Sequence, residues 1–199
     1  MDLGLKDKAA LITGGSRGIG RAIALGLAAE GCRVAICART PERLDQTRQE
    51  VAAAGVECLA ITADMTQPAD IERAVAETIR GLGTIHILIN NVGGSRGTTV
   101  EATSDEDWTY AIDLNLMAAV RASRAALPEL KKNGWGRILI ISSIFGREAG
   151  GTAPYNAVKA AEISLAKSLA REVGQHGIRV NSVAPGSILF PGGSWQRRL

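Results

Sequence analysis

The chain has 199 residues, of which 46% are hydrophobic and 22% are charged, and its formal net charge is +3. This length fits one compact domain over residues 1–199, and the composition is ordinary for a globular protein. Basic and acidic residues are interleaved, which argues against a nucleic-acid-binding surface. No apolar stretch approaches the length of a bilayer span and no apolar leader opens the chain, so the sequence predicts a cytoplasmic protein that does not bind membranes.

The cysteines and histidines do not form a pattern typical of metal sites. Cys32, Cys37 and Cys58 are odd in number and widely spaced, which favours reduced thiols in the core over disulfides or metal ligands. His86 lies within an apolar run and His176 precedes a glycine. We therefore expect no metal site.

Apolar runs alternate with segments of helical periodicity almost to the end of the chain. The runs suited to buried strands are 9–13, 33–38, 57–61, 85–89, 137–142 and 178–184. The segments with helical periodicity are 18–30, 41–54, 68–81, 104–132 and 154–174. Near-continuous apolar strands are typical of a parallel sheet that helices cover on both faces. The order predicts an α/β fold with a doubly wound, Rossmann-like parallel sheet.

Prolines and glycines indicate where several of these helices begin and end. Pro41 and Pro68 suit the first helical position, where a missing N–H costs nothing. Glycines that favour a helix end follow or close four of the predicted helices, namely Gly31, Gly55, Gly81 and Gly174.

A glycine-rich turn directly follows the first predicted strand, with the sequence Thr13-Gly14-Gly15-Ser16-Arg17-Gly18-Ile19-Gly20, and a helix begins there. A strand-to-helix turn directs backbone N–H groups and the helix dipole at one point, where a pyrophosphate can bind. The spacing is G-x-x-x-G-x-G, unlike the G-x-G-x-x-G of many dinucleotide-binding folds. The alternative is a turn that is merely tight. The predicted phosphate-binding residues are Gly14, Ser16, Arg17, Gly18, Ile19 and Gly20.

Further motifs follow this turn in a characteristic order: D-M-T at 64–66, N-N-V-G at 90–93, Asn115, Ser142-Ser143, Y-N-A-V-K at 155–159 and P-G at 185–186. With the glycine-rich turn, they resemble the short-chain dehydrogenase/reductase family, in the branch that includes the 3-oxoacyl carrier-protein reductases. The resemblance implies an oxidoreductase that passes a hydride between a nicotinamide cofactor and a carbonyl compound or secondary alcohol.

The Tyr155 and Lys159 pair carries the predicted chemistry. A free tyrosine has a pKa near 10, and lowering it by about three units takes roughly 4 kcal/mol of differential stabilisation. A nearby cation supplies such stabilisation, and residues four apart share one helix face. Because Y-x-x-x-K is common on helices, the assignment depends on the motifs around it.

Two more residues complete the predicted catalytic set. Ser143 follows the fifth strand, at the edge where ligands of open α/β sheets bind, and its hydroxyl can hold the substrate oxygen. Ser142 is a rival, and both serines could instead satisfy backbone groups at the strand end. Asn115 is unusual inside a helix; the resemblance implies that it holds a water connecting Lys159 to solvent, whereas the alternative is a partly exposed polar residue.

The residues after the second strand indicate NADP rather than NAD. A carboxylate there would bind the ribose hydroxyls and repel a 2′-phosphate. The chain instead has Ala38 followed by Arg39, whose guanidinium can bind a phosphate with two hydrogen bonds, and Arg17 adds a second positive charge. The alternative is that Arg39 is a solvated surface residue.

The resemblance implies further cofactor contacts. It places Asp64 and Met65 near the adenine, although Asp64 would equally cap the turn before Gln67. The other residues that it implies are Asn91, Gly93, Tyr155, Lys159, Pro185, Gly186 and Ile188, with Lys159 reaching the nicotinamide ribose.

The resemblance also bears on assembly and on the extent of the chain. It implies a homodimer or homotetramer formed through helices 104–132 and 154–174, and relatives continue beyond a position like Leu199, so we expect a chain truncated at its C-terminus. An alternative function is a catalytically weak dinucleotide-binding or interaction module with the same fold.

Overall fold

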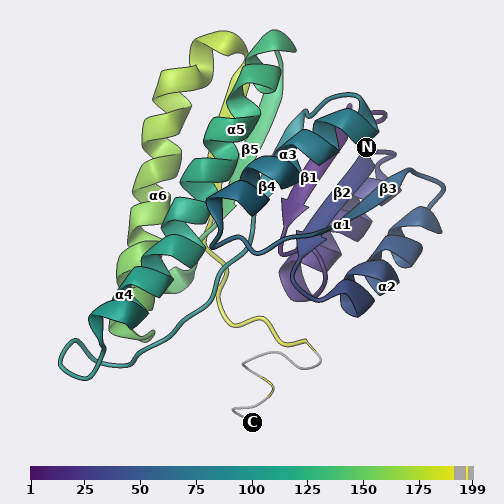
Figure 1. The fold of residues 1–199 in the computed structure, drawn as a ribbon. Coiled ribbons are helices and arrows are strands. Elements are labelled where there is room, and N and C mark those ends of the chain that lie inside the picture. Colours follow the sequence, from purple (N-terminus) through teal and green to yellow (C-terminus); the bar gives the residue numbers. More distant parts are fainter. Residues whose placement is uncertain (191–195, 197–199) are drawn as a thin grey trace.

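The computed structural model describes residues 1–190 and residue 196. In that part of the chain, six parallel strands form one sheet in the order β3-β2-β1-β4-β5-β6 (Figure 1). The strands are β1 (Ala9–Thr13), β2 (Arg33–Ala38), β3 (Cys58–Thr62), β4 (Ile87–Asn90), β5 (Gly136–Ile141) and β6 (Ile178–Val183). The predicted doubly wound α/β fold is confirmed, while the predicted domain range beyond residue 190 lies outside the described residues except at Gln196.

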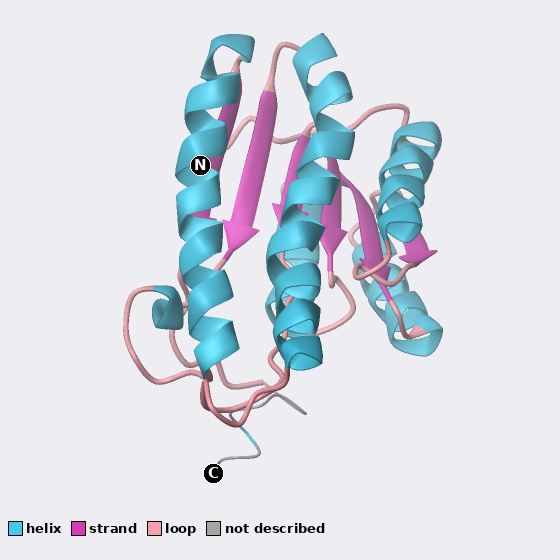
Figure 2. Ribbon diagram, turned by 60° about the vertical axis from the view of Figure 1, so that its left-hand side comes forward, coloured by secondary structure: helices cyan, strands magenta, loops and turns pink. Residues whose placement is uncertain are grey.

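Helices cover the sheet in two layers (Figure 2). The helices are α1 (Gly18–Ala29), α2 (Pro41–Ala52), α3 (Pro68–Leu82), α4 (Asp105–Ala111), α5 (Ala118–Lys132) and α6 (Ala153–Val173), with short helical turns η2 (Ile144–Gly146) and η3 (Gly174–His176). α1 and α2 pack with one buried cluster, and α3, α5 and α6 pack with the other. Among the described residues, no helix combines the length and apolarity that a bilayer span needs.

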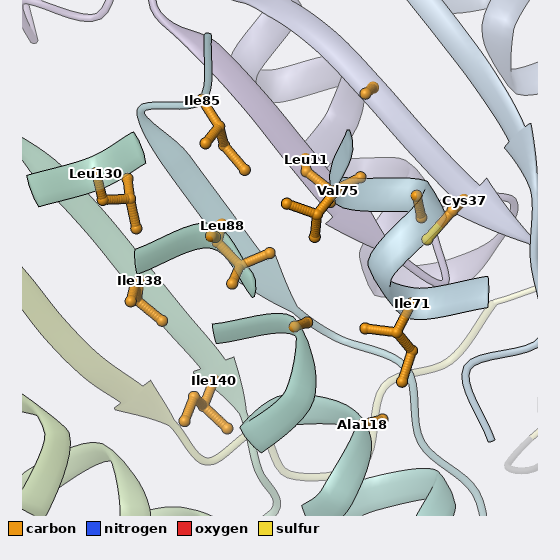
Figure 3. Packing of buried hydrophobic residues seen from close by; sticks show 14 of the residues in the cluster. Leu11, Cys37, Ile71, Val75, Ile85, Leu88, Ala118, Leu130, Ile138 and Ile140 are labelled. Atoms are coloured by element: carbon orange, nitrogen blue, oxygen red, sulfur yellow. The ribbon is translucent and has the colours of Figure 1, made fainter. Parts of the chain in front are cut away.

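The larger cluster shows why the strand sequences are so continuously apolar. Leu11, Leu88 and Ile138 come from the adjacent strands β1, β4 and β5, and Val75 of α3 faces them (Figure 3). Every residue of β1 and of β4 is buried, because helices cover both faces at the middle of the sheet. Cys37 is a buried free thiol in this cluster, Cys32 is one in the other cluster and Cys58 is half-buried, in agreement with the prediction of reduced thiols.

The prediction of helical cover on both faces is wrong at β6. Its residues alternate between buried and exposed, with Val183 45% exposed. The reason is that α1 and α2 pack over β1, β2 and β3, whereas α6 packs against β6 from the opposite face. Because β6 lies at the edge of the sheet and a helix covers only one of its faces, its residues alternate between buried and exposed.

The single helix predicted over 104–132 is also wrong. The structure divides it into α4, a π-helical segment η1 (Ile112–Met117) and α5. The Asn115 side chain donates to the Ala111 carbonyl oxygen at 2.8 Å, in competition with the ordinary backbone hydrogen bond of a helix. π-Helical segments within helices are frequent at functional sites.

One predicted helix end is misplaced. α3 continues through Gly81 to Leu82, and Gly83 has the left-handed backbone, with a φ of +76°, that ends the helix. Gly81 instead lies where a side chain would overlap Leu59 of β3. The lack of a side chain at Gly81 therefore allows α3 to pack closely on β3, and Gly81 does not end the helix.

Candidate active site

Two loops meet at the carboxyl edge of the sheet, where the chain leaves the neighbouring strands β1 and β4. The Asn91 side chain donates to the carbonyl oxygens of Thr13 and Gly14 at 2.9 and 3.1 Å. In return, the Thr13 hydroxyl oxygen accepts the N–H groups of Asn91 and Val92. These bonds fix the glycine-rich turn to the end of β4, at the strand-order switch where open α/β sheets bind ligands.

The glycine-rich turn requires its glycines. Gly14 and Gly18 have left-handed backbones, with φ values of +67° and +53°, which side-chain-bearing residues rarely adopt. A Cβ at Gly20 would overlap the Gly14 carbonyl oxygen and the Asn91 side chain. Because α1 begins at Gly18, its N-terminus faces the turn and favours an anion there.

A cleft of about 480 Å³ opens beside this turn. Most of the predicted cofactor-binding residues line it, namely Gly14, Ser16, Arg17, Gly18, Ile19, Gly20, Arg39, Asp64, Met65, Asn91, Gly93 and Tyr155. The glycine cradle and the helix N-terminus fit a dinucleotide phosphate, and one continuous surface runs from them to the Tyr155 side chain.

Four predicted cofactor residues do not line this cleft, namely Lys159, Pro185, Gly186 and Ile188. Pro185 accepts a hydrogen bond from the Ile144 N–H at 2.9 Å, and Gly186 is exposed. Ile188 lines a neighbouring cavity instead. The sequence analysis missed Phe190, whose ring would be 2.8 Å from a Cβ at Gly18 and which lines both hollows.

Three exposed arginines line the cleft at its outer end, by which we mean the end at Arg39; the end at Tyr155 is its inner end. Arg17 and Arg39 were predicted there, and Arg43 of α2 joins them. The sequence contained a signal for Arg43, because it follows Arg39 by four residues and falls in the first turn of a helix that Pro41 begins. The Ala38 side chain lines the same end, so no carboxylate from this position opposes an anion.

Asp64 takes the turn-capping role that was its alternative. One of its carboxylate oxygens accepts both the N–H and the hydroxyl of Thr66 at 2.9 Å. Its own N–H donates to the Asp70 carboxylate at 2.8 Å. Asp64 still lines the cleft, so the capping role and the predicted adenine contact are compatible.

Tyr155 and Lys159 lie one turn apart on α6, with the Lys159 Nζ atom 5.6 Å from the centroid of the tyrosine ring. Burial raises the pKa of the Tyr155 phenol, a hydrogen bond with Ser143 lowers it, and the charge of Glu162 raises it further. The pKa of the phenol therefore lies above its usual value, opposite to the lowering that the sequence analysis expected from a nearby cation.

The two serines after β5 have different partners. The Ser142 hydroxyl donates to the Lys159 carbonyl oxygen at 2.7 Å and is fully buried there. The Ser143 hydroxyl oxygen accepts the Phe145 N–H at 3.2 Å, and Ser143 lowers the pKa of the Tyr155 phenol. Both serines thus bond backbone groups, as the alternative held, and Ser143 is the one that also acts on the pKa of the phenol.

Asn115 is buried in the π-helical segment, and its amide bonds backbone atoms. Its Nδ2 donates to the carbonyl oxygens of Gly94 and Ala111, and its Oδ1 accepts the Gly94 N–H at 3.2 Å. A Cβ at Gly93 would be 2.8 Å from Asn115 Oδ1 and 3.1 Å from Lys159 Nζ. Asn115 Oδ1 and Lys159 Nζ therefore both lie next to Gly93, which lines the cleft, whereas neither Asn115 nor Lys159 lines it.

The sequence analysis missed Glu162, a carboxylate buried beside Lys159. Its two oxygens accept hydrogen bonds from Lys159 Nζ at 3.1 and 2.9 Å. The signal was present, because Glu162 follows Lys159 by three residues and Tyr155 by seven, which places all three on one helix face.

Comparisons with known proteins agree with this geometry. A family model described as short chain dehydrogenase matches residues 8–193. The 3-oxoacyl-[acyl-carrier-protein] reductase FabG of Escherichia coli (strain K12) is 43% identical over 188 residues, which cover 94% of this chain and 75% of that protein. The FabG of Staphylococcus aureus (strain N315) is 38% identical over 184 residues, covering 92% of this chain and 75% of that protein.

Solved structures are similar over nearly the whole chain. L-Sorbose reductase from Gluconobacter frateurii, complexed with NADPH and L-sorbose, has a TM-score of 0.94 at 35% identity and covers 100% of this chain and 81% of its own. An NAD⁺-bound xylitol dehydrogenase has a TM-score of 0.91 at 29% identity and covers 98% of this chain and 75% of its own.

Proposed function

Because this chain belongs to the short-chain dehydrogenase family, we propose that it is an NADP-dependent oxidoreductase in which Tyr155 exchanges a proton with the substrate oxygen. Its family makes the chain an NAD(P)-dependent enzyme that acts on carbonyl or alcohol substrates. The observation that carries the proposal is the position of Tyr155, which lines the same cleft as the glycine-rich turn and shares its helix face with Lys159.

The bound dinucleotide supplies or accepts the hydride at its nicotinamide ring. In carbonyl reduction, the C=O π electrons move to the oxygen as the new C–H bond forms, and that oxygen takes the proton of the Tyr155 hydroxyl. Ser143 donates a hydrogen bond to the same oxygen and stabilises its developing charge. Lys159 stabilises the phenolate left on Tyr155, which regains a proton from solvent.

Asn115 supports this set next to Gly93. Its hydrogen bonds to Gly94 hold the loop after β4 against the π-helical segment, next to the Lys159 ammonium. We propose that the backbone opened by this segment holds the water through which protons reach Lys159.

Charge at the outer end of the cleft supports NADP over NAD. The related structures include one complex with NADPH and one with NAD⁺, so family membership leaves both cofactors open. In this chain, Arg17, Arg39 and Arg43 line the cleft. Guanidinium groups bind phosphate through charge-assisted, paired hydrogen bonds, which a 2′-phosphate offers and a 2′-hydroxyl does not.

The experiment that tests the function combines binding and turnover. NADPH and NADH are titrated by cofactor fluorescence, and turnover is followed at the nicotinamide absorbance with L-sorbose, a 3-oxoacyl thioester and simple ketones, or with xylitol and NADP⁺. We expect tighter binding of NADPH and turnover of at least one compound. Binding without turnover of any compound would favour the catalytically weak module instead.

We also propose that two or four copies associate through α5 and α6. These helices lie next to each other over one face of the sheet (Figures 1 and 2). The exposed positions of α6 include the small residues Ala157, Ala160 and Ser164, which follow one helix face and allow a second helix to pack closely. Light scattering of the wild type and of Ala160→Arg tests this, with dissociation expected in the variant.

A further inference from the structure

The short helical turn η2 follows Ser143 directly, and the function proposed above gives it no role. The Ser143 hydroxyl oxygen accepts the Phe145 N–H at 3.2 Å, and the Gly146 N–H donates to the Ser143 carbonyl oxygen at 2.9 Å. Gly146 packs directly on α6, because a Cβ there would be 2.7 Å from the Lys159 carbonyl oxygen. The turn therefore lies between Ser143 and the backbone of the helix that carries Tyr155.

The half-buried Phe145 side chain extends from this turn and packs against the loop 147–152. A Cβ at Gly150 would be 2.6 Å from the Cε1 atom of the ring, and a Cβ at Gly151 would be 3.3 Å from its Cδ2 atom. Because glycine has no Cβ, the backbone of the loop can lie directly on the ring at both positions.

Gly151 also lies against the tyrosine of the proposed mechanism. A Cβ at Gly151 would be 3.1 Å from the Cδ1 atom of Tyr155, and it would overlap the Oδ1 atom of Asn156. The backbone at Gly151 is thus in contact with the ring of Tyr155 as well as with that of Phe145. A loop that moved away from Phe145 would therefore also leave the tyrosine ring.

Few hydrogen bonds hold the middle of this loop. The Glu148 N–H donates back into η2 at 2.8 Å, and the Ala153 N–H donates to the Thr98 carbonyl oxygen at 2.9 Å. Between these two anchors, residues 149–151 make no backbone–backbone hydrogen bond to any part of the chain that the structure describes. The place of the middle of the loop therefore depends on its packing against Phe145.

We propose, on the basis of the function above, that Phe145 is a positioning residue whose ring holds the loop 147–152 against Tyr155 and so fixes the tyrosine ring at the inner end of the cleft. Phe145 does not line the cleft. Its contribution therefore concerns the alignment of the proton donor with the substrate and not the binding of the cofactor.

The first test is steady-state kinetics with the compound of the panel above that is turned over fastest, together with fluorescence titration of NADPH. For Phe145→Ala, we expect kcat to fall by about 10–100-fold, because a misplacement of about 1 Å can cost up to 10²-fold in rate. The affinity for NADPH should change little. Phe145→Met keeps a long apolar side chain that fills the same space and should restore most of the rate.

Leu59→Ala is the matched control for a purely structural effect. It also shortens a half-buried apolar side chain, but in β3 and outside the cleft. We expect it to lower the urea midpoint without lowering kcat. A wild-type kcat in Phe145→Ala, or an equal loss of kcat in Leu59→Ala, would overturn the proposal. Retained turnover in Tyr155→Phe would instead refute the catalytic scheme, so the two failures are distinguishable.

A second measurement needs no turnover. Tetranitromethane nitrates accessible tyrosine rings, and mass spectrometry of peptides reports the two tyrosines of the chain, Tyr110 and Tyr155, separately. We expect Tyr155 to be nitrated several-fold faster in Phe145→Ala than in the wild type, with Tyr110 unchanged as the internal reference. Equal rates at Tyr155 in the two proteins would show that the loop does not depend on Phe145 and would overturn the proposal.

Discussion

The two ends of the cleft hold their charges in different ways. At the outer end, the side chains of Arg17, Arg39 and Arg43 are exposed, and each acts on an anion through its own charge. At the inner end, Lys159 and Glu162 are buried and hydrogen-bonded to each other, and the charge of Glu162 raises the pKa of the Tyr155 phenol. Exposed charges contribute modestly and nearly independently, whereas buried ones are coupled. We therefore expect single substitutions to have the larger effects at the inner end.

The largest effect is expected for Tyr155→Phe, which removes the hydroxyl and little else. Turnover should fall by about 10²–10⁴-fold, the range for loss of a positioned acid–base group. The affinity for NADPH should change little, and fluorescence titration beside steady-state kinetics measures both. Comparable turnover in the variant would contradict the catalytic assignment.

The two serines after β5 offer a matched pair at the same end. Ser143→Ala should lower turnover by about 10²–10³-fold, as expected for one lost donor to the developing oxyanion. Ser142→Ala should mainly lower the free energy of unfolding, by about 0.5–1.5 kcal/mol, because its hydroxyl bonds the Lys159 carbonyl. Kinetics and urea denaturation of both variants check this, and a larger kinetic loss in Ser142→Ala would reverse the assignment.

At the glycine-rich turn, substitutions affect the packing of the protein as well as the binding of the cofactor. Gly20→Ala adds a methyl group that would overlap Gly14 and Asn91, so we expect a loss of about 1–3 kcal/mol in the free energy of unfolding and weaker NADPH binding. Gly26→Ala is the control in the same helix, where the added methyl meets open space. It should stabilise the protein by about 0.5–1 kcal/mol, and similar losses in both variants would contradict the packing explanation.

A smaller effect is expected for Arg39→Asp. A charge-assisted hydrogen bond to phosphate contributes about 1.5–3 kcal/mol, so NADPH affinity should fall at least tenfold while NADH affinity changes far less. Arg80→Asp, an exposed arginine of α3 outside the cleft, makes the same change of charge as a control. Equal losses for both cofactors would show that Arg39 does not distinguish them.

The smallest effect is expected for His86. This residue directly precedes β4, at the end of the strand opposite the cleft. Burial first, and then the charges of Lys8 and Arg33, lower its pKa, and its Nδ1 accepts the Ala9 N–H. The unfolded chain therefore takes up a proton below a pH of about 6.5 before the folded chain does, so stability falls as the pH drops through this range. His86→Asn keeps an acceptor, and its urea midpoint should decline less with acidification. Parallel declines would contradict this.

Local patterns in the sequence determined the strands, the crossover helices and the outer end of the cleft. Continuous apolar runs indicate strands covered on both faces, and the glycine-rich turn and Arg39 lie beside such strands, so their places follow from nearby residues. The same reasoning missed the one-sided cover of β6, because cover depends on which helices reach that edge of the sheet.

Only the tertiary structure decided the inner end of the cleft. Adjacent serines have the same chemistry, and their roles separate because the Ser142 hydroxyl bonds the Lys159 carbonyl oxygen, whereas Ser143 lowers the pKa of the Tyr155 phenol. The division of the long helix at Asn115 depends on a side chain bonding a backbone carbonyl one turn away. The hydrogen bonds of the Lys159 ammonium likewise include an acceptor from β5, because a buried ammonium takes its partners from whichever elements fold around it.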